Sequence, residues 1–194
     1  MLPTRDPPQN QRPIQTESER LEKIFQANGH EKRAGVEIII SDRIDFRTTT
    51  IREDREGYFI ILKGRVHQED ITIINIYAPN IGAPKYIRKI LEDFKKDTDC
   101  ETLITGDFNA PLSTMDRSPK QRINKDIMAL NDTLDQMDLI DMYRMFHPRE
   151  AKYIFFSNAQ RTFSKTDHRV GCKGSLKKFK KIEIIQALSW ITMA

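Results

Sequence analysis

Short apolar runs in the first half of the chain have the pattern of β-strands. They are rich in Ile, Val, Thr and aromatic residues, and clusters of Gly, Asp, Glu or Arg bound them. The runs occupy residues 36–40, 45–51, 58–66 and 71–77. Their even spacing predicts an antiparallel sheet. Within them, the uninterrupted apolar stretches at 38–40 and 59–62 predict strands that are covered on both faces.

The second half of the chain predicts helices that alternate with further strands. Pro84 fits the first turn of a helix whose apolar positions recur at helical spacing as far as Phe94. A second helix is predicted over residues 123–137, and residues 102–105 between the two helices predict a short buried strand. Near the start of the chain, residues 17–25 fit either a short helix or an edge strand.

The remaining segments complete a prediction of the fold class. Residues 141–147 are predicted to be a connection, and residues 153–156 and 162–170 a hairpin around the polar turn 157–161. Strands followed by strands that alternate with helices predict an α/β (α+β) fold of two packed sheets with helices outside. The length suits one domain, which we place at residues 21–190.

Composition and hydropathy disfavour membrane-spanning, secreted and disulfide-rich proteins. Residues 1–20 are predicted to be a disordered or atypical N-terminal segment, because Pro, Gln and charged residues bury little apolar surface. No apolar run approaches the roughly 20 residues of a membrane span, and no secretory signal is recognisable. Cys100 and Cys172 are too few for a disulfide framework or a thiolate metal site. We therefore expect an intracellular protein, nuclear or cytoplasmic, that is not secreted.

The net charge favours a polyanionic partner only weakly. The formal charge is +4 and the pI about 9.0, and clustered Lys and Arg neutralise phosphates. Many proteins that touch no nucleic acid carry a similar charge. The basic run that includes Lys177, Lys178, Lys180 and Lys181 is open to the same two interpretations, as a phosphate contact or a solvated charged face.

Candidate chemistry follows the predicted strand 102–105. Gly106, Asp107, Phe108 and Asn109 come directly after it. A carboxylate and an amide two residues apart can aim at one point, and glycine lets the backbone turn there and a ligand approach closely. Their oxygens suit a hard metal ion. An ordinary Asx-turn has the same sequence, so this motif alone does not decide between the two.

Two other motifs place polar side chains in or after strands. Tyr77 and Asn80 follow one strand, and Pro79 between them ends its ladder. The alternative for Tyr77 is a buried core ring with its hydroxyl satisfied. Asp167 stands in a late strand within Ser164–His168 (SKTDH), where a carboxylate among apolar neighbours needs a partner. Its alternative is a salt bridge to a nearby Lys or Arg.

Together these stretches resemble a known family. The sequences ILKGRVHQEDITIINIYAPNIGAPKYI, LITGDFNAPLSTMDRS, NKDIMALNDTL, DLIDMYRMFHP and TFSKTDHRVG are similar to the endonuclease domain of mammalian LINE retrotransposons. That domain belongs to the endonuclease/exonuclease/phosphatase superfamily. The resemblance runs from about residue 24 to about residue 188. It implies a four-layered sandwich of two mostly antiparallel β-sheets flanked by helices, here incomplete.

The resemblance also implies a chemistry and a set of site residues. Family members nick DNA by Mg²⁺-dependent phosphodiester hydrolysis. By resemblance, Asp107 orients or deprotonates the attacking water, Asn109 holds the phosphate, and both contribute to a metal site. Tyr77 donates to the phosphoryl oxygens, and Asp167 orients a catalytic histidine. The implied phosphate- or DNA-binding residues are Asn80, Arg117, Asn158 and Arg161. DNA is the implied partner, and we expect a monomer.

Departures from the family pattern predict an impaired enzyme. Nothing in residues 1–20 resembles the family's first strands and their metal-binding glutamate, and Glu17 and Glu19 are not in a matching context. Ser189 matches the serine of the final Ser-Asp-His triplet, but Trp190 and Ile191 stand in place of the aspartate and histidine. We therefore expect a domain truncated at both ends that binds Mg²⁺ poorly and cuts DNA very slowly or not at all.

Three alternatives to an active nuclease remain open. The chain could be a nucleic-acid-binding module without catalysis, or a translated retrotransposon remnant with no function. A superfamily phosphatase acting on inositol phosphates or lipids is the third, which the long matches disfavour but which fold alone does not exclude.

Overall fold

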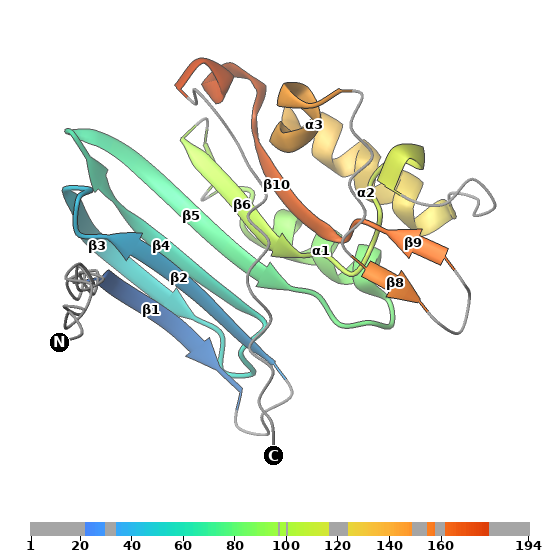
Figure 1. Cartoon of the computed structure of the whole chain (residues 1–194), viewed down its shortest axis with the longest axis horizontal. Coiled ribbons are helices and arrows are strands. Elements are labelled where there is room, and N and C mark those ends of the chain that lie inside the picture. The colour runs from blue at the N-terminus through green and yellow to red at the C-terminus, as the bar shows by residue number, and fades with distance from the viewer. Residues whose placement is uncertain are drawn as a thin grey trace, which may run out of the picture.

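The large sheet of the computed structural model positions the candidate site. The structure describes residues 22–29, 34–96, 98–99, 101–116, 124–148, 155–157 and 162–178. The sheet has six strands in the order β3-β4-β5-β6-β10-β7 (Figure 1). These are β3 (Phe46–Glu53), β4 (Phe59–Val66), β5 (Glu69–Tyr77), β6 (Thr102–Asp107), β7 (Leu139–Asp141) and β10 (Asp167–Cys172). All neighbours pair antiparallel except β5 and β6, which are parallel.

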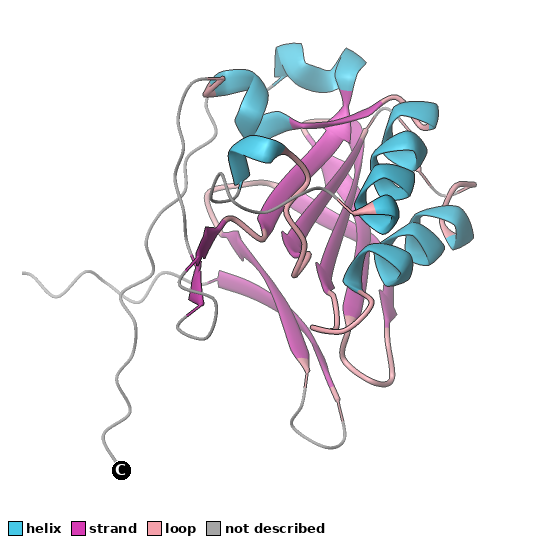
Figure 2. Cartoon of the chain, turned by 90° about the vertical axis from the view of Figure 1, so that its right-hand side faces the viewer, coloured by secondary structure: helices cyan, strands magenta, loops and turns pink. Residues whose placement is uncertain are grey.

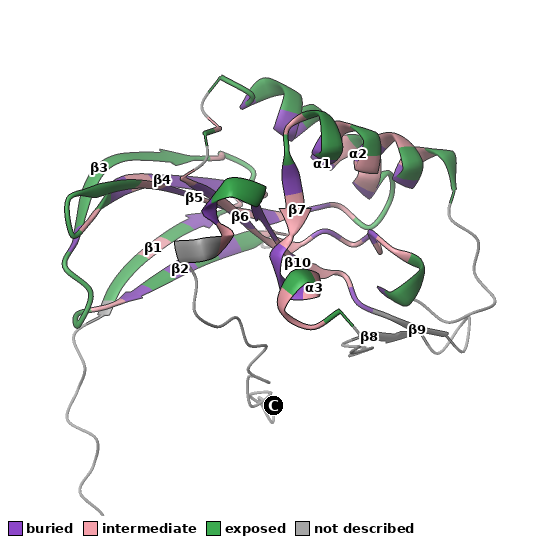
Figure 3. Cartoon of the chain, turned by 90° about the horizontal axis from the view of Figure 1, so that it is seen from above, coloured by how far each residue is buried: buried purple, intermediate pink, exposed green. Residues whose placement is uncertain are grey.

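A smaller sheet and several helices cover the two faces of the large sheet. Strands β1 (Glu22–Asn28) and β2 (Gly35–Ser41) pair antiparallel and lie against β4 and β5. Helices α1 (Ala83–Asp93) and α2 (Lys125–Gln136) lie on the opposite face (Figures 2 and 3). Short elements complete the described part: α3 (Met142–Phe146), β8 (Phe155–Ser157), β9 (Thr162–Ser164), and the 3-10 turns Thr114–Asp116 and Lys173–Lys178.

Two apolar cores result, one on each face of the large sheet. On the helix side, Ile61, Ile74 and Ile104 pack against Ile87 of α1 and other apolar residues of α1 and α2. On the other side, the buried residues of β1 and β2 pack against residues of β3 and β4; they are Ala27, Val36, Ile38, Ile40, Phe46, Ile60 and Leu62. Because each strand alternates its side chains between faces, β4 contributes to both cores. The predicted α+β class and the predicted double coverage of residues 59–62 are therefore confirmed.

Other local predictions need correction. Ile39 is 55% exposed, since only one face of β2 meets the large sheet, so residues 38–40 are not covered on both sides. Residues 141–147 are not a simple connection, because they contain the end of β7 and helix α3. The predicted hairpin exists as β8 paired with β9, but residues 167–170 leave it and join the large sheet as part of β10. The segment 17–25 is a strand in its described portion.

Within the described ranges, no helix combines the length and the apolar character that crossing a membrane requires.

Candidate active site

Three of the predicted site residues form a row across neighbouring strands of the large sheet. Tyr77 ends β5 and is paired with Asp107, which ends β6; Asp107 is paired in turn with Asp167, which begins β10. Directly opposed residues project from the same face of a sheet, and neighbouring strands lie about 4.8 Å apart. We call Tyr77, Asp107 and Asp167 the rim row. Its face is the one that carries β1 and β2, because Tyr77 packs against that core.

The backbone conformation of Gly106 leaves no room for a side chain against β5. Gly106 has a φ of +128°, and a Cβ built there would lie 2.0 Å from the carbonyl oxygen of Ile76. Only glycine accepts both conditions without displacement. Of the two roles expected for this glycine, a turn of the backbone and the approach of a ligand, the backbone conformation alone already requires it.

Asn109 ties the end of β6 to the end of β5. Its side-chain Nδ2 donates to the carbonyl oxygen of Ala78 at 2.7 Å, and Ala78 N–H donates to the carbonyl oxygen of Asp107 at 2.9 Å. The backbone N–H of Asn109 donates to Asp107 Oδ1 at 2.9 Å, and the φ of Asn109 is +45°. The Asx-turn that the sequence offered as an alternative is thus present. Among the described residues, the Asn109 amide keeps one N–H and its oxygen available for other partners. The Asp107 carboxylate also keeps most of its capacity to accept hydrogen bonds.

Asp167 lies in an environment that disfavours its charged form. Within the described residues it makes no direct ion pair, so the salt bridge considered as its alternative is not found there. Burial, followed by the charge of Asp107, raises the pKa of Asp167, while Arg169, His168 and Lys165 act in the opposite direction. Perturbed carboxylates that share a face of a sheet are typical of catalytic and metal sites, although structural networks also produce them.

The ring of Tyr77 stacks on that of Tyr58, which in turn contacts Tyr86. The rings of Tyr58 and Tyr77 are stacked with centroids 6.4 Å apart and an interplanar angle of 4°. Tyr86 of α1 contacts Tyr58 at 5.8 Å. Burial, together with the charges of Asp54, Tyr58 and Glu56, raises the pKa of Tyr86 to about 12. Tyr77 is only half-buried, and its position in the rim row leaves it next to Asp107.

The predicted DNA-binding residues are only partly described. Asn80 is exposed in the loop between β5 and α1, three residues beyond Tyr77. Arg117, Asn158 and Arg161 lie outside the described residues, as do residues 1–20, Lys180, Lys181 and Ser189–Ile191.

A buried charged cluster lies behind the rim row, on the helix side of the sheet. It was not among the features predicted from the sequence. His168 follows Asp167 and points to the opposite face. Its Nδ1 lies 3.0 Å from Asp141 Oδ2, and its Nε2 lies 2.9 Å from the carbonyl oxygen of Ala110. Lys165, which is 1% exposed, donates to Asp141 at 3.2 Å and lies 4.5 Å above the ring of Tyr143. The adjacency of Asp167 and His168 was the one signal in the sequence.

Asp116 extends this charged cluster to the loop that follows β6. It binds Arg144 at 2.6 Å and accepts from the N–H and the hydroxyl of Ser113, each at 2.8 Å. Lys165 N–H donates to the carbonyl oxygen of Asp116 at 2.7 Å, and Phe108 N–H donates to that of Thr166 at 2.8 Å. The loop that carries Asn109 is therefore held against the start of β10 at several points.

The same charged cluster contains the described group that comes nearest to a metal site. One ligand atom each of Asp116, Asp141 and His168 lie within 4.8 Å of one another. Arg144 and Lys165 already neutralise the two carboxylates, and both ring nitrogens of His168 face oxygen acceptors. A divalent ion there would have to displace these cations, so we interpret the group as a structural network.

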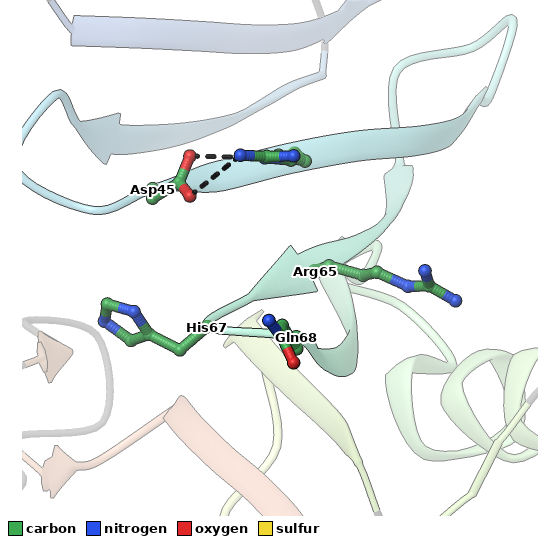
Figure 4. A pocket seen from close by; sticks show the side chains of 5 residues that line it. Asp45, Arg65, His67 and Gln68 are labelled. Atoms are coloured by element: carbon green, nitrogen blue, oxygen red, sulfur yellow. Dashed lines mark hydrogen bonds and ion pairs between the residues drawn. The ribbon is translucent and has the colours of Figure 1, made fainter.

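The described hollows lie away from the rim row. One, of about 450 Å³, is lined by Asp45, Arg47, Arg65, His67 and Gln68 around the turn between β4 and β5 (Figure 4). A second, of about 520 Å³, lies beside the same turn and reaches Ser175. In the first, Arg47 and Arg65 are each paired with an acidic residue, Asp45 and Asp70. This turn is at the opposite end of β5 from Tyr77, so neither hollow is the site of the rim row.

The charge of Asp141 predicts a specific pH dependence of stability. Burial alone would raise the pKa of Asp141, but the hydrogen bond and charge of His168, then Lys165, lower it from 3.8 to about 2. A lowered folded-state pKa stabilises the protein above pH 3.8, and this stabilisation is lost as the pH falls towards 2. We expect the stability difference between the wild type and Asp141→Asn to shrink by roughly 2 kcal/mol from pH 6 to pH 2.

Urea unfolding of both proteins across that pH range measures the difference. Other acidic groups titrate in both proteins and cancel. A difference that stays constant below pH 4 would show that the lowered pKa is not present.

Comparisons with known structures identify the fold. No protein-family model matches the chain. The endonuclease domain of TRAS1, a telomere-specific non-LTR retrotransposon, is similar with a TM-score of 0.61 at 13% identity, over 80% of this chain and 69% of that one. An AP endonuclease from Archaeoglobus fulgidus gives 0.57 at 18% identity, over 80% and 68% of the respective chains. The 3′ phosphatase NExo from Neisseria, bound to a product DNA hairpin, gives 0.54 at 16% identity, over 74% and 64%.

These similarities establish the class of fold. The described residues share the α+β fold of these two endonucleases and this phosphatase, which is the fold class that the sequence predicted. The chain spans about two thirds of the length of these proteins. The comparisons include a retrotransposon endonuclease, and at these identities they concern the fold alone.

Proposed function

We propose that the chain is a Mg²⁺-dependent DNA endonuclease-like domain of retrotransposon origin with weak phosphodiesterase activity. The observation that carries this proposal is the rim row, in which Tyr77, Asp107 and Asp167 are in register on one face of the sheet. Independent support comes from the neighbours, which are DNA-processing enzymes by name.

The roles of the rim residues follow from their chemistry. Asp107 orients or deprotonates a water molecule that attacks phosphorus. The bond from phosphorus to one bridging oxygen then breaks, and that oxygen leaves as an alcohol after it takes a proton from solvent. Tyr77 donates its hydroxyl to a phosphoryl oxygen, and the second N–H of the Asn109 amide does the same, since the first binds Ala78. Asn80, exposed on the adjacent loop, contacts the same phosphate region.

A hard divalent cation fits part of this donor set. Asp107 offers a carboxylate and Asn109 an amide oxygen, and the charge of Asp107 already raises the pKa of Asp167, a repulsion that a cation would relieve. When bound, Mg²⁺ neutralises negative charge that develops on the phosphoryl oxygens. The sequence has Trp190 and Ile191 where the resembled family has its final aspartate and histidine. Affinity for the ion and the rate of cutting are therefore both low in this proposal.

A nicking assay tests the proposal. Supercoiled plasmid is incubated with Mg²⁺ and the wild type, Asp107→Ala, or the double variant Trp190→Asp/Ile191→His, which restores the family residues. We expect slow nicking by the wild type, faster nicking by the double variant, and none by Asp107→Ala in either background.

The other outcomes separate the remaining alternatives. DNA binding that weakens with salt, without nicking even in the double variant, would replace the proposal with a non-catalytic binding module. No binding, no nicking and no cooperative melting would indicate a remnant without function. Nicking that survives Asp107→Ala would remove Asp107 from the site.

A further inference from the structure

The larger hollow beside the turn between β4 and β5 combines apolar and acidic lining. It has a volume of about 520 Å³ and lies at the end of the large sheet where β5 and β6 begin and β10 ends. Three apolar side chains line it, those of Ile44, Val66 and Ile71, and Ile44 is 43% exposed. Its charged lining consists of the carboxylates of Glu69, Asp70 and Glu101, with no Lys or Arg from the described part of the chain.

The small polar groups of this lining already have partners within the protein. The hydroxyl of Thr102 donates to Asp99 Oδ1 at 2.9 Å. The hydroxyl of Ser175 donates to the carbonyl oxygen of Cys172 at 2.8 Å. What the hollow offers to an occupant is therefore apolar surface and negative charge.

This combination defines the chemistry of the occupant. Carboxylates repel the phosphates of nucleic acid, so the hollow does not suit DNA. A segment in which lysines surround large apolar residues suits it, because the apolar residues fill the hollow while the ammonium groups meet the carboxylates. Asp70 also binds Arg65 at 2.6 Å, and a carboxylate can accept from more than one cation.

The chain itself supplies such a segment next to the hollow. Residues 177–182 have the sequence KKFKKI, in which Phe179 and Ile182 stand among four lysines; we call them the basic segment. The basic segment continues from the 3-10 turn Lys173–Lys178 that follows β10 (Figure 1), and Ser175 of this turn is buried and lines the hollow. A 3-10 turn rises about 2 Å per residue, so the described chain stops about 6 Å beyond Ser175.

We infer that the basic segment of the same chain docks in this hollow, with Phe179 against the apolar lining and the lysines beside Glu69 and Glu101. Phe179 is the anchor, because burial of a large aromatic ring supplies most of the stabilisation of such a contact. The lysines contribute less, since ion pairs near the surface are weak.

This inference goes beyond the proposed function and gives the lysines an intramolecular role. The sequence alone left them as a phosphate contact or a solvated charged face. The hollow lies at the opposite end of β5 from Tyr77, so lysines docked there do not contact a phosphate at the rim row.

Limited trypsin digestion of the full chain tests the docking, because trypsin cuts after a lysine only when the segment around it is released. Mass spectrometry follows cutting after the lysines of the basic segment, and cutting after Lys89 of α1 measures global unfolding in the same sample. The proteins are the wild type, Phe179→Ala, Phe179→Leu and Ile44→Ser. Ile51→Ser is the matched control, since Ile51 is 45% exposed and does not line the hollow.

The expected result is specific to docking in the hollow. Phe179→Ala and Ile44→Ser should each be cut in the basic segment about tenfold faster than the wild type, with no change at Lys89. Phe179→Leu should be cut no more than about threefold faster, because leucine keeps much of the apolar contact. The double variant Ile44→Ser/Phe179→Ala should be cut no faster than Phe179→Ala alone, since both substitutions remove the same contact. Ile51→Ser should match the wild type.

The charged part of the contact is tested separately. Glu69→Gln/Glu101→Gln should be cut about threefold faster than the wild type in low salt. The difference should shrink in high salt, which screens the ion pairs. Glu53→Gln/Glu56→Gln, at exposed positions that do not line the hollow, should have no effect.

Four results would overturn the inference. Equal cutting of the wild type and Phe179→Ala would show that the basic segment is not docked, and faster cutting of Phe179→Ala without any effect of Ile44→Ser would place it elsewhere. Protection that rises with protein concentration would place the segment of a second copy in the hollow. Protection that appears only with DNA would assign the lysines to nucleic acid. None of these readouts depends on plasmid nicking, so failure of this inference leaves the proposed function standing.

Discussion

Replacement of Asp141 by alanine is expected to lower the free energy of unfolding by about 3–5 kcal/mol. Asp141 accepts from Lys165 and His168, which are almost completely buried, and its Oδ1 caps the start of α3 by accepting from Arg144 N–H. Removal of the carboxylate leaves the Lys165 ammonium buried without its counterion. An uncompensated buried charge costs far more than the ion pair contributed.

A second substitution tests whether the unpaired charge of Lys165 causes this loss of stability. Lys165→Met removes the stranded charge and keeps an apolar chain above Tyr143, so the double variant Asp141→Ala/Lys165→Met should recover part of the loss. Asp132→Ala, at an exposed position on α2, is the matched control and should change stability by less than about 0.5 kcal/mol. Urea unfolding measures all four proteins. Equal small losses in Asp141→Ala and Asp132→Ala would contradict the charged cluster described here.

Replacement of Gly106 by alanine is expected to cost about 2–4 kcal/mol and to disturb the rim row. The methyl group would lie 2.0 Å from the carbonyl oxygen of Ile76 on β5, and the φ of +128° is unfavourable for any side chain. Relief of the clash requires the backbone at residue 106 to change its conformation or the two strands to move apart. Either change would disturb the pairing of Tyr77 with Asp107 one residue further along.

Gly174→Ala provides a matched control for this prediction. A methyl group there would meet only the Cys172 sulfur at 3.8 Å, an ordinary contact distance. Thermal melting of the two variants gives the difference in stability, and any residual plasmid nicking should disappear with Gly106→Ala. A Gly106→Ala protein as stable as Gly174→Ala would show that the backbone at Gly106 does not have the conformation described.

The sequence by itself predicted three strands of the large sheet and the two long helices, and it offered the side chains of the rim row as candidates. Short β-rich runs bounded by Gly and charged residues predicted β3, β4 and β5, and helical spacing predicted α1 and α2. Tyr77 and Asp107 could be found because they end strands, and Asp167 because a carboxylate stood in an apolar pattern. Strand ends and periodicity are local properties, so neighbouring residues along the chain carry that information.

Only the tertiary structure decided which strand faces are covered and which buried ion pairs and hydrogen bonds lie behind the rim row. Ile38 and Ile39 look alike in the sequence, but β2 packs on one face, so one is buried and the other exposed. Lys165 looks like a solvated lysine until β7 and α3 bring Asp141 and Tyr143 to it. The partners of His168 are 27 and 58 residues away. Burial and ion pairing depend on segments that are distant in the sequence and meet only in the folded chain. A local sequence pattern therefore cannot predict these contacts.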